Sequence, residues 1–212
     1  LGANVRVGDI VTLRREFTEL AGGLVAGKAF DDRAAVACID LCLQYLAGLK
    51  HTWDVYAVAT VQEEVGVKGA LTSTFGINPD AGVALDVGHG NMLGVPEVDT
   101  VNVGGGPAIG FGPNIHPVLY EQLTAAAAKY EIAQQMDPIP GPSGTDAWAM
   151  QVVREGIPTA LISIPLRYMH TTVETLSLKD LERIGRLLAL FIAGLTEESA
   201  RELGLPPAAR DK

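Results

Sequence analysis

The sequence predicts a mixed α/β fold in which a mostly parallel sheet is sandwiched by helices. Apolar runs rich in β-branched residues alternate along the chain with segments whose apolar residues recur every three or four positions. Runs that are almost entirely apolar are typical of strands buried on both faces, and such strands need helices on both sides of the sheet. At 212 residues, 48% of them hydrophobic, the chain is long enough for one well-buried core.

Helical periodicity is clearest in residues 31–49, where Ala35, Cys38 and Cys42 belong to one apolar stripe. The carboxylates that open this segment suit the N-terminus of a helix. Because Cys38 and Cys42 are four residues apart on a helix, their side chains run side by side, so we expect two core thiols rather than a disulfide. Further helices are expected over residues 65–75, 117–130, 146–154 and 178–195.

Extended segments separate these helices. Residues 53–61, 80–87 and 158–164 have the β-branched and apolar composition of buried strands. Weaker extended segments are expected over residues 5–13, with a turn at Gly8–Asp9, after the loop at Gly22–Gly23, over residues 101–112 and over residues 132–136. The polar stretch 197–212 is expected to fray at its end.

The charge balance excludes some classes of partner. The formal net charge is −9 and the sequence pI is about 4.9, with no cluster of Lys and Arg that could neutralise phosphates, so no nucleic acid is expected as a partner. The longest purely apolar run, residues 187–193, is far shorter than the roughly 20 residues that span a bilayer. No signal-peptide pattern is present. We therefore expect a cytoplasmic protein with no membrane partner.

Acidic residues and one histidine stand where α/β folds form ligand sites. Asp31, Glu63-Glu64, Asp86 and His170 each lie next to the end of an expected strand or helix. Ligand sites of open α/β sheets lie outside the carboxyl ends of the strands, because the loops that leave neighbouring strands converge there. Carboxylates and imidazole bind divalent metals, and a second carboxylate beside a ligand can act as general base. The pattern predicts a metal site.

Each of these residues also has a purely structural interpretation. Asp31 and Asp32 could cap the helix that they open, Glu63-Glu64 could be a solvated acidic loop, and His170 could be a satisfied structural side chain. Asp86 is harder to explain in this way, because a carboxylate inside Val-Ala-Leu-Asp-Val would be a buried charge unless a cation meets it.

Two further features stay open. Residues 143–146, Ser-Gly-Thr-Asp, are either part of a binding loop or a turn followed by a helix cap. His89 and His116 lie in expected loops, and either could contribute to the site. Motifs of other enzymes are absent from the sequence: it contains no Gly-x-Ser-x-Gly elbow, no phosphate-binding loop ending in Gly-Lys-Ser/Thr and no His-Glu-x-x-His helix.

Five motifs together resemble the co-catalytic di-metal aminopeptidases of the glutamyl aminopeptidase and tetrahedral aminopeptidase group, some of whose relatives are labelled endoglucanases. They occur in the family's order and cover about residues 5–195. The motifs are Gly27-Lys28-Ala29-Phe30-Asp31-Asp32-Arg33, Glu63-Glu64-Val65-Gly66, Leu85-Asp86-Val87, Gly141-Pro142-Ser143-Gly144-Thr145-Asp146-Ala147 and Tyr168-Met169-His170-Thr171. The resemblance implies a zinc-exopeptidase-like catalytic domain.

The resemblance also implies a role for each candidate ligand. Asp31 would bridge two metal ions, Glu64 and His170 would complete one site, and Asp86 would belong to the other. Glu63 would be the general base that takes a proton from the bridging water and delivers it to the leaving amine. The implied cofactors are two divalent ions, Zn²⁺ or Co²⁺, which accept these oxygen and nitrogen ligands.

Short peptides are the implied substrates. Gly144 and Thr145 are candidate substrate contacts, and Arg167 is a candidate for a basic pocket that would accept an acidic residue. Residues 1–24 would be the end of an inserted β-rich dimerisation domain or its linker, and residues 25–212 the C-terminal portion of the catalytic domain. In the family, a histidine of a His-x-Asp motif ahead of the insertion completes the Asp86 site. No histidine precedes His51 in this sequence, so we expect the Asp86 site of this chain to be weak or empty. A homo-oligomer is implied for the full-length protein.

Two other functions remain as alternatives. An inactive or incomplete fragment would keep the fold and act at most as a metal-binding or interaction module. A glycoside hydrolase would use paired carboxylates without a metal, and it would give His170 and Asp86 no role. The metal content and the sensitivity of hydrolysis to EDTA distinguish these hypotheses from a metalloaminopeptidase.

Overall fold

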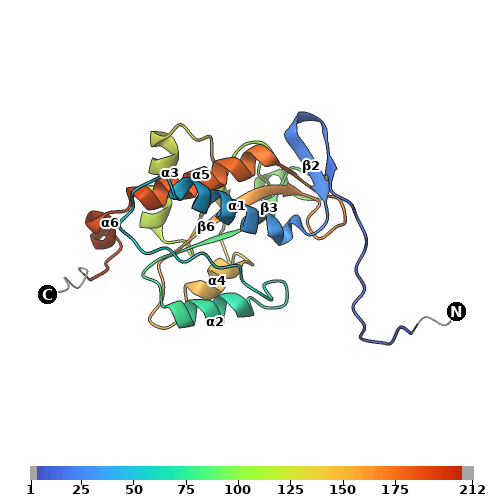
Figure 1. The fold of residues 1–212 in the computed structure, drawn as a ribbon, viewed down its shortest axis with the longest axis horizontal. Helices are drawn as coiled ribbons and strands as arrows, with labels where there is room; N and C mark the ends of the chain where they lie inside the picture. The colour runs from blue at the N-terminus through green and yellow to red at the C-terminus, as the bar shows by residue number, and fades with distance from the viewer. Residues whose placement is uncertain (1–3, 207–212) are drawn as a thin grey trace.

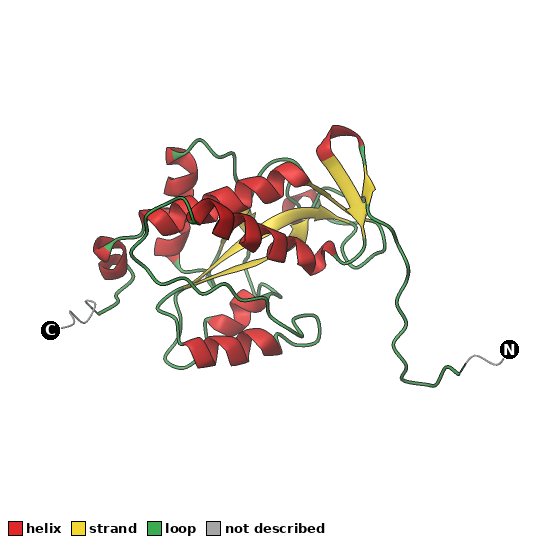
Figure 2. Ribbon diagram, viewed as in Figure 1, coloured by secondary structure: helices red, strands yellow, loops and turns green. Residues whose placement is uncertain are grey.

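A seven-stranded sheet lies between two layers of helices in the computed structural model, which describes residues 4–206 (Figure 1, Figure 2). Helices α1 (Phe30–Leu46), α3 (Pro117–Lys129) and α5 (Leu178–Gly194) cover one face of the sheet. Helices α2 (Lys68–Ile77) and α4 (Asp146–Met150) cover the other face. The expected α/β sandwich is confirmed.

Strand β6 (Thr159–Arg167) is the centre of the sheet. Strand β3 (Gly82–His89) runs parallel to β6 over its whole length. The opposite edge of β6 pairs antiparallel with β4 (Ala108–Phe111) and with β7 (Glu174–Ser177). The other elements are β1 (Thr18–Glu19), η1 (Ala21–Gly23), β2 (Leu24–Gly27), η2 (Glu97–Asp99) and β5 (Gln135–Pro138). The sheet continues from β4 to β5, and from β7 through β2 to β1.

The sheet is mixed, but it is less parallel than expected. Of the six strand pairings in residues 4–206, only β3–β6 and β4–β5 are parallel. The connection between β6 and β7, residues 168–173, is too short for a parallel crossover, which needs a dozen or more residues. Strand β7 is not among the expected strands, because its sequence, Glu-Thr-Leu-Ser, contains one strongly apolar side chain.

Two expected extended segments do not become strands. Residues 53–61 form no β-ladder with other described residues, and Tyr56 is 67% exposed. The composition of this segment favours extended backbone, but a strand also needs a neighbouring backbone, which the local sequence does not specify. Residues 5–13 contain the expected turn, in which the Asp9 carboxylate accepts the Arg6 N–H at 2.7 Å, but they form no ladder in the described structure.

The polar C-terminal stretch begins with a short helix that was not among the expected elements. Helix α6 (Glu197–Glu202) forms its first part, ahead of the end that is predicted to fray. Its first turn is held by a capping box, in which the Thr196 hydroxyl accepts the Ser199 N–H and the Ser199 hydroxyl accepts the Thr196 N–H. The end of the stretch, residues 207–212, lies outside the described residues.

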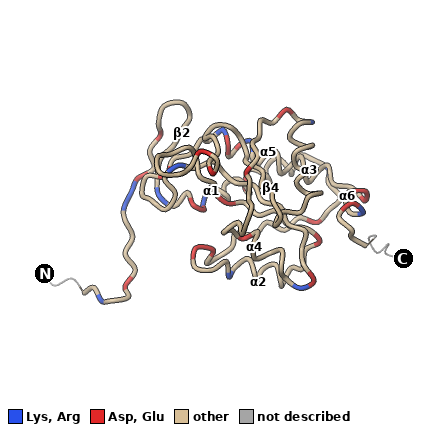
Figure 3. The backbone as a smooth tube through the Cα atoms, turned by 180° about the vertical axis from the view of Figure 1, so that it is seen from behind, with Lys and Arg blue, Asp and Glu red and all other residues tan. Residues whose placement is uncertain are grey.

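The described residues, 4–206, bear on the expectations that the chain binds neither a membrane nor a nucleic acid. No helix in this range is long and apolar enough to cross a bilayer. Lys and Arg stand in several separate stretches of the chain and are interspersed with Asp and Glu (Figure 3). The cytoplasmic location and the lack of a nucleic-acid partner stay predictions.

Helices α1 and α5 pack closely against each other at a glycine. A Cβ atom on Gly185 of α5 would lie 2.6 Å from the Cβ atom of Leu41 and 3.1 Å from the backbone oxygen of Cys38. Cys38 and Cys42 of α1 are both buried and both free, as expected. The absence of a side chain at residue 185 therefore allows the two helices to approach.

Replacement of Gly185 by Ala should lower the free energy of unfolding. The added methyl group would overlap α1, and overpacking of a well-packed contact typically costs about 1–3 kcal/mol. Thermal unfolding followed by circular dichroism is the measurement. Gly194→Ala is the matched control, because Gly194 ends the same helix and its Cβ position has nothing within 4 Å. Equal melting temperatures for the two variants would show that the α1–α5 contact does not depend on Gly185.

Candidate metal centre

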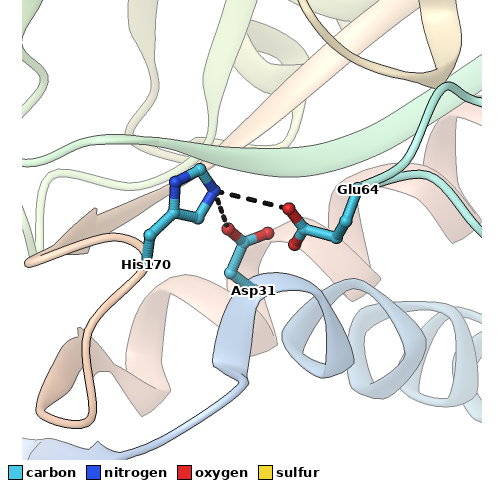
Figure 4. Close-up of side chains that lie close together, drawn as sticks. All are labelled: Asp31, Glu64 and His170. Carbon is cyan, nitrogen blue, oxygen red and sulfur yellow. Dashed lines mark ion pairs between the residues drawn. The ribbon is translucent and has the colours of Figure 1, made fainter. Parts of the chain in front are cut away.

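Three segments that are distant in the sequence bring Asp31, Glu64 and His170 together (Figure 4). Asp31 lies at the start of α1, Glu64 in the loop before α2, and His170 between β6 and β7. The Nε2 atom of His170 lies 3.1 Å from Oδ2 of Asp31 and 3.5 Å from Oε2 of Glu64. One ligand atom from each side chain lies within 4.8 Å of the other two. This is a spacing at which one ion could contact all three.

The structure at the start of α1 distinguishes the two interpretations of Asp31 and Asp32, as metal ligands or as helix caps. Asp31 and Asp32 both have non-helical backbone angles, so regular helix begins after them. The Oδ1 atom of Asp32 accepts the backbone N–H of Ala35 at 3.0 Å, which is the contact of an N-cap residue. Asp31 turns instead toward His170, and its side chain is 7% exposed. Helix capping therefore explains Asp32, and Asp31 is available as a ligand.

The cluster carries an excess of negative charge. Burial, followed by the neighbouring Glu64 carboxylate, raises the pKa of Asp31 to about 6. Burial, followed by the charges of Asp146, Glu64 and Asp31, also raises the pKa of Glu63. Within residues 4–206, the basic side chain that lies against Asp31 and Glu64 is the imidazole of His170. A divalent cation would supply the positive charge that these carboxylates lack, and their oxygen and nitrogen atoms fit its ligand requirements.

Asp86 lies within β3, on the same sheet, but it is not part of the three-residue group. Its side chain is buried, and its Oδ1 atom accepts the N–H of Val87 at 2.7 Å. Burial is the main cause that raises the pKa of Asp86 to about 8. The Val87 N–H opposes this shift, and the charges of Glu63 and Asp31 add to it. The buried carboxylate without a cationic partner that the sequence predicts is therefore found in the described structure, and its role as a ligand stays a prediction.

Comparison with known proteins identifies the family. The family model described as M42 glutamyl aminopeptidase matches residues 2–187. The chain belongs to the M42 family. It is 38% identical over 190 residues to a lysyl aminopeptidase of Pyrococcus furiosus, an alignment that covers 90% of this chain and 54% of that protein. An aminopeptidase structure from the archaeon Desulfurococcus kamchatkensis matches with a TM-score of 0.84 at 39% identity, covering 97% of this chain and 58% of that one.

A second matching structure belongs to a protein that forms a large assembly. The TET1 peptidase of Pyrococcus horikoshii can assemble into a tetrahedron or a large octahedral shell, and it matches with a TM-score of 0.72 at 30% identity. The match covers 85% of this chain and 53% of that one. The chain therefore spans about half the length of the M42 relatives that it matches. The resemblance deduced from the motifs is confirmed, and the roles of individual residues stay predictions.

The candidate substrate-binding residues Gly144, Thr145 and Arg167 lie in two places. Gly144 has a φ angle of 69°, a conformation that favours glycine, in the turn before α4. Thr145 caps α4, since its hydroxyl accepts the backbone N–H of Ala147 at 3.3 Å. Arg167 is the last residue of β6, and its buried Nε atom has no hydrogen-bond partner in residues 4–206. The helix-cap interpretation is confirmed for Thr145, and contacts with substrate stay predictions.

Two carboxylates of this M42 chain have contacts that the motif pattern does not reveal. Asp146 accepts the hydroxyl of Thr60 at 2.6 Å through Oδ2, while its buried Oδ1 has no partner in the described structure. Glu174 is 2% exposed and accepts backbone N–H groups from the segments of both Asp31 and His170. The sequence gives no signal for Glu174, because the strand that it begins was not expected and its burial depends on the completed fold.

Without metal, the M42 chain should become less stable as the pH rises from about 5 to about 8. The pKa of Asp86 is raised to about 8 and that of Asp32 to about 9, mainly by burial. Both groups titrate near 4 in an unfolded chain, to within about half a unit. The folded chain therefore holds more protons in this window, and the stability present at low pH is lost as the pH rises through the folded pKa values.

Melting temperatures of the EDTA-treated chain across this pH range test the expectation. A melting temperature that stays constant or rises from pH 5 to pH 8 would contradict it. Saturating Zn²⁺ provides the control, because metal ligands must be deprotonated and metal binding therefore stabilises the chain more at higher pH.

Proposed function

We propose that this chain carries the metal centre of an M42 aminopeptidase that removes N-terminal residues from short peptides. The observation that carries the proposal is the convergence of Asp31, Glu64 and His170 within 4.8 Å. Catalytic zinc sites typically use three protein ligands and leave a further position for water or substrate, and Co²⁺ accepts the same ligand atoms. The aminopeptidase names of the M42 relatives support the same activity.

Each residue has a distinct role in this proposal. Asp31, Glu64 and His170 would hold one divalent ion, and Asp31 and Asp86 would hold a second. When bound, such ions would lower the pKa of a water and polarise the scissile carbonyl. Glu63 accepts the proton of the attacking water and returns it to the leaving amine. The raised pKa of Glu63, caused mainly by its burial, suits a group that must bind and release a proton.

The second ion should be held more weakly than the first. Only Asp31 and Asp86 are assigned to it, whereas catalytic sites typically offer three protein ligands. His89 and His116 are the histidines that could add a ligand. We therefore propose one tightly held ion per 212-residue chain and a second ion that exchanges readily.

Substrate contacts are proposed for Gly144, Thr145 and Arg167. The guanidinium of Arg167 would pair with an acidic N-terminal residue, because its buried Nε has no partner among residues 4–206. A preference for glutamate over leucine at the substrate N-terminus is the expected consequence.

The full-length protein is proposed to be a homo-oligomer. The TET1 peptidase of Pyrococcus horikoshii, which is 30% identical, can assemble into a tetrahedron or a large octahedral shell. Residues 1–24 are proposed to lead from an inserted dimerisation domain, which would take part in such an assembly. Light scattering on the full-length protein measures its mass and therefore tests the proposal.

Metal content and hydrolysis should be measured together on the purified 212-residue chain. Elemental analysis counts the ions, and leucine- and glutamate-p-nitroanilide report cleavage with Co²⁺, without Co²⁺ and with EDTA. Bound metal with EDTA-sensitive cleavage supports the proposal. A chain that holds one ion but cleaves nothing would be an incomplete piece of a longer enzyme. A chain that binds no ion would overturn the metal centre, and EDTA-resistant cleavage of a β-glucan would favour a glycoside hydrolase.

A further inference from the structure

Glu174 connects the two segments that carry Asp31 and His170. Its Oε2 atom accepts the backbone N–H of Phe30 at 2.7 Å and that of Asp31 at 3.2 Å. Its Oε1 atom accepts the backbone N–H of His170 at 3.0 Å. The side chain is 2% exposed, so these bonds do not compete with bulk water. One buried carboxylate therefore joins the backbone at two of the three proposed ligands.

Both of these segments contain a residue whose backbone conformation must be stabilised by contacts from other parts of the chain. His170 has a φ angle of 62°, and Ala29, directly before Phe30, has a φ angle of 55°. Residues other than glycine rarely adopt such positive φ values, and they persist there only when surrounding contacts enforce them. If the bonds to Glu174 were lost, we expect the backbone of His170 to relax and its imidazole to move away from Asp31.

We propose that Glu174 is a positioning residue of the metal centre, which fixes the separation of Asp31 and His170 without binding the ion itself. This inference rests on the proposed metal site. Both oxygens of Glu174 are engaged by N–H donors, so the side chain acts through the ligands that it orients. Groups that orient metal ligands from outside the coordination sphere typically change metal affinity by about 10–100-fold when they are replaced.

A carboxylate is required at residue 174 because all of its partners are donors. A Gln amide has one acceptor oxygen and one donor NH₂ group. If the amide oxygen faces Phe30 and Asp31, the NH₂ group meets the N–H of His170. The reverse orientation sets the NH₂ group against Phe30 and Asp31. Glu174→Gln therefore keeps the size of the side chain but loses the hydrogen bond to at least one of the two segments that carry Asp31 and His170.

Asp180 provides a matched control, since it is also a buried carboxylate that accepts backbone N–H groups. It is 0% exposed and accepts the N–H of Gly104 at 2.6 Å and that of Gly106 at 2.8 Å. These glycines belong to a different loop from the three proposed ligands. Asp180→Asn and Glu174→Gln should both lower the melting temperature, because each leaves a buried N–H facing another donor.

The test is the Zn²⁺ dissociation constant of the 212-residue chain, measured by competition with a chromophoric chelator at one pH. Glu174→Gln is expected to weaken binding by about 10–100-fold, whereas Asp180→Asn should stay close to the wild-type chain. The visible spectrum of the Co²⁺-loaded chain, which reports ligand geometry, should change in Glu174→Gln and not in Asp180→Asn. A purely structural role of Glu174 would not separate the two variants in this way.

Three outcomes are distinguishable. Wild-type affinity in a folded Glu174→Gln chain would overturn the positioning role and leave the metal centre intact. Equal losses of affinity in Glu174→Gln and Asp180→Asn would also overturn it. The weaker Zn²⁺ binding would then be explained by the lower stability of the folded chain in both variants. Failure of the wild-type chain to bind Zn²⁺ would overturn the proposed function itself. If Glu174→Gln does not fold, Glu174→Asp replaces it, and wild-type affinity in that shortened variant would overturn the inference.

Discussion

Replacement of Glu63 by Gln should remove peptide hydrolysis and leave metal binding almost unchanged. Glu63 is the residue proposed to move the proton, and a glutamine of nearly the same shape cannot accept it. General acid–base catalysis typically contributes about 10²–10⁴-fold to the rate, so kcat should fall by at least about a hundredfold. The three residues that converge within 4.8 Å do not include Glu63, so the ligand set stays intact. Turnover of leucine-p-nitroanilide and metal content per chain are the two measurements.

Glu64→Gln is the matched control for this experiment. It makes the same chemical change at the next residue, but Glu64 belongs to the cluster and lies 3.5 Å from His170. We expect Glu64→Gln to lose metal and activity together, while Glu63→Gln loses activity alone. Both variants are made in the form of the enzyme, the 212-residue chain or the full-length protein, whose unmutated version cleaves peptides. Hydrolysis retained in Glu63→Gln would refute its assignment as the base, and loss of metal would make it a ligand.

Replacement of Asp31 by Asn should have the largest effect on metal binding. Asp31 is the ligand proposed to serve both ions, and its side chain is the most buried of the three in the cluster. Residues outside the coordination sphere already change metal affinity by about 10–100-fold, so loss of a shared ligand should exceed that range. Zn²⁺ affinity measured by chelator competition should therefore fall by more than about a hundredfold, and hydrolysis should fall to background.

The same substitution should not destabilise the metal-free chain at neutral pH. Burial and the charge of Glu64 raise the pKa of Asp31 to about 6, which means that its ionised form is disfavoured in the folded state. An uncharged Asn removes this repulsion, so the melting temperature in EDTA should stay equal or rise. Asp40→Asn, which changes an exposed side chain on the same helix, should alter neither the Zn²⁺ affinity nor the melting temperature in EDTA. A metal-free Asp31→Asn chain that melts well below wild type would mean that Asp31 has a structural role instead.

Local sequence predicted the buried elements of this fold better than their pairing. The apolar segments 80–87 and 158–164 appear as β3 and β6, because strands covered on both faces have a distinctive composition. Periodicity likewise located α1 and α5. The strand at residues 53–61 was wrong for a different reason: composition indicates that a segment can be extended, but not that a neighbour lies beside it. The antiparallel β7 depends in the same way on its contacts with β6.

In the candidate site, too, local sequence predicted some features, and others depend on contacts that only the completed fold makes. Asp31, Glu64 and His170 could be predicted because they stand next to the ends of helices and strands, where loops converge. Position at the start of a helix did not separate Asp31 from Asp32, and only the family resemblance favoured Asp31 as the ligand. The structural distinction depends on which carboxylate accepts the Ala35 N–H. The contacts of Glu174 could not be predicted either. They depend on backbone donors from both ends of the chain, which only the completed fold brings together.

If Asp31 and His170 hold an ion as proposed, that ion is a removable cross-link between two segments that are distant in the sequence. Asp31 and His170 enclose most of the described chain between them, including the central strands β3 and β6. Unfolding must then either release the ion and lose its binding free energy, or keep it and hold a loop of about 140 residues closed, at an entropic cost of about 5 kcal/mol. Either route raises the free energy of unfolding of the loaded chain. The concentration of free metal would therefore set how long the folded chain persists as well as whether it can act.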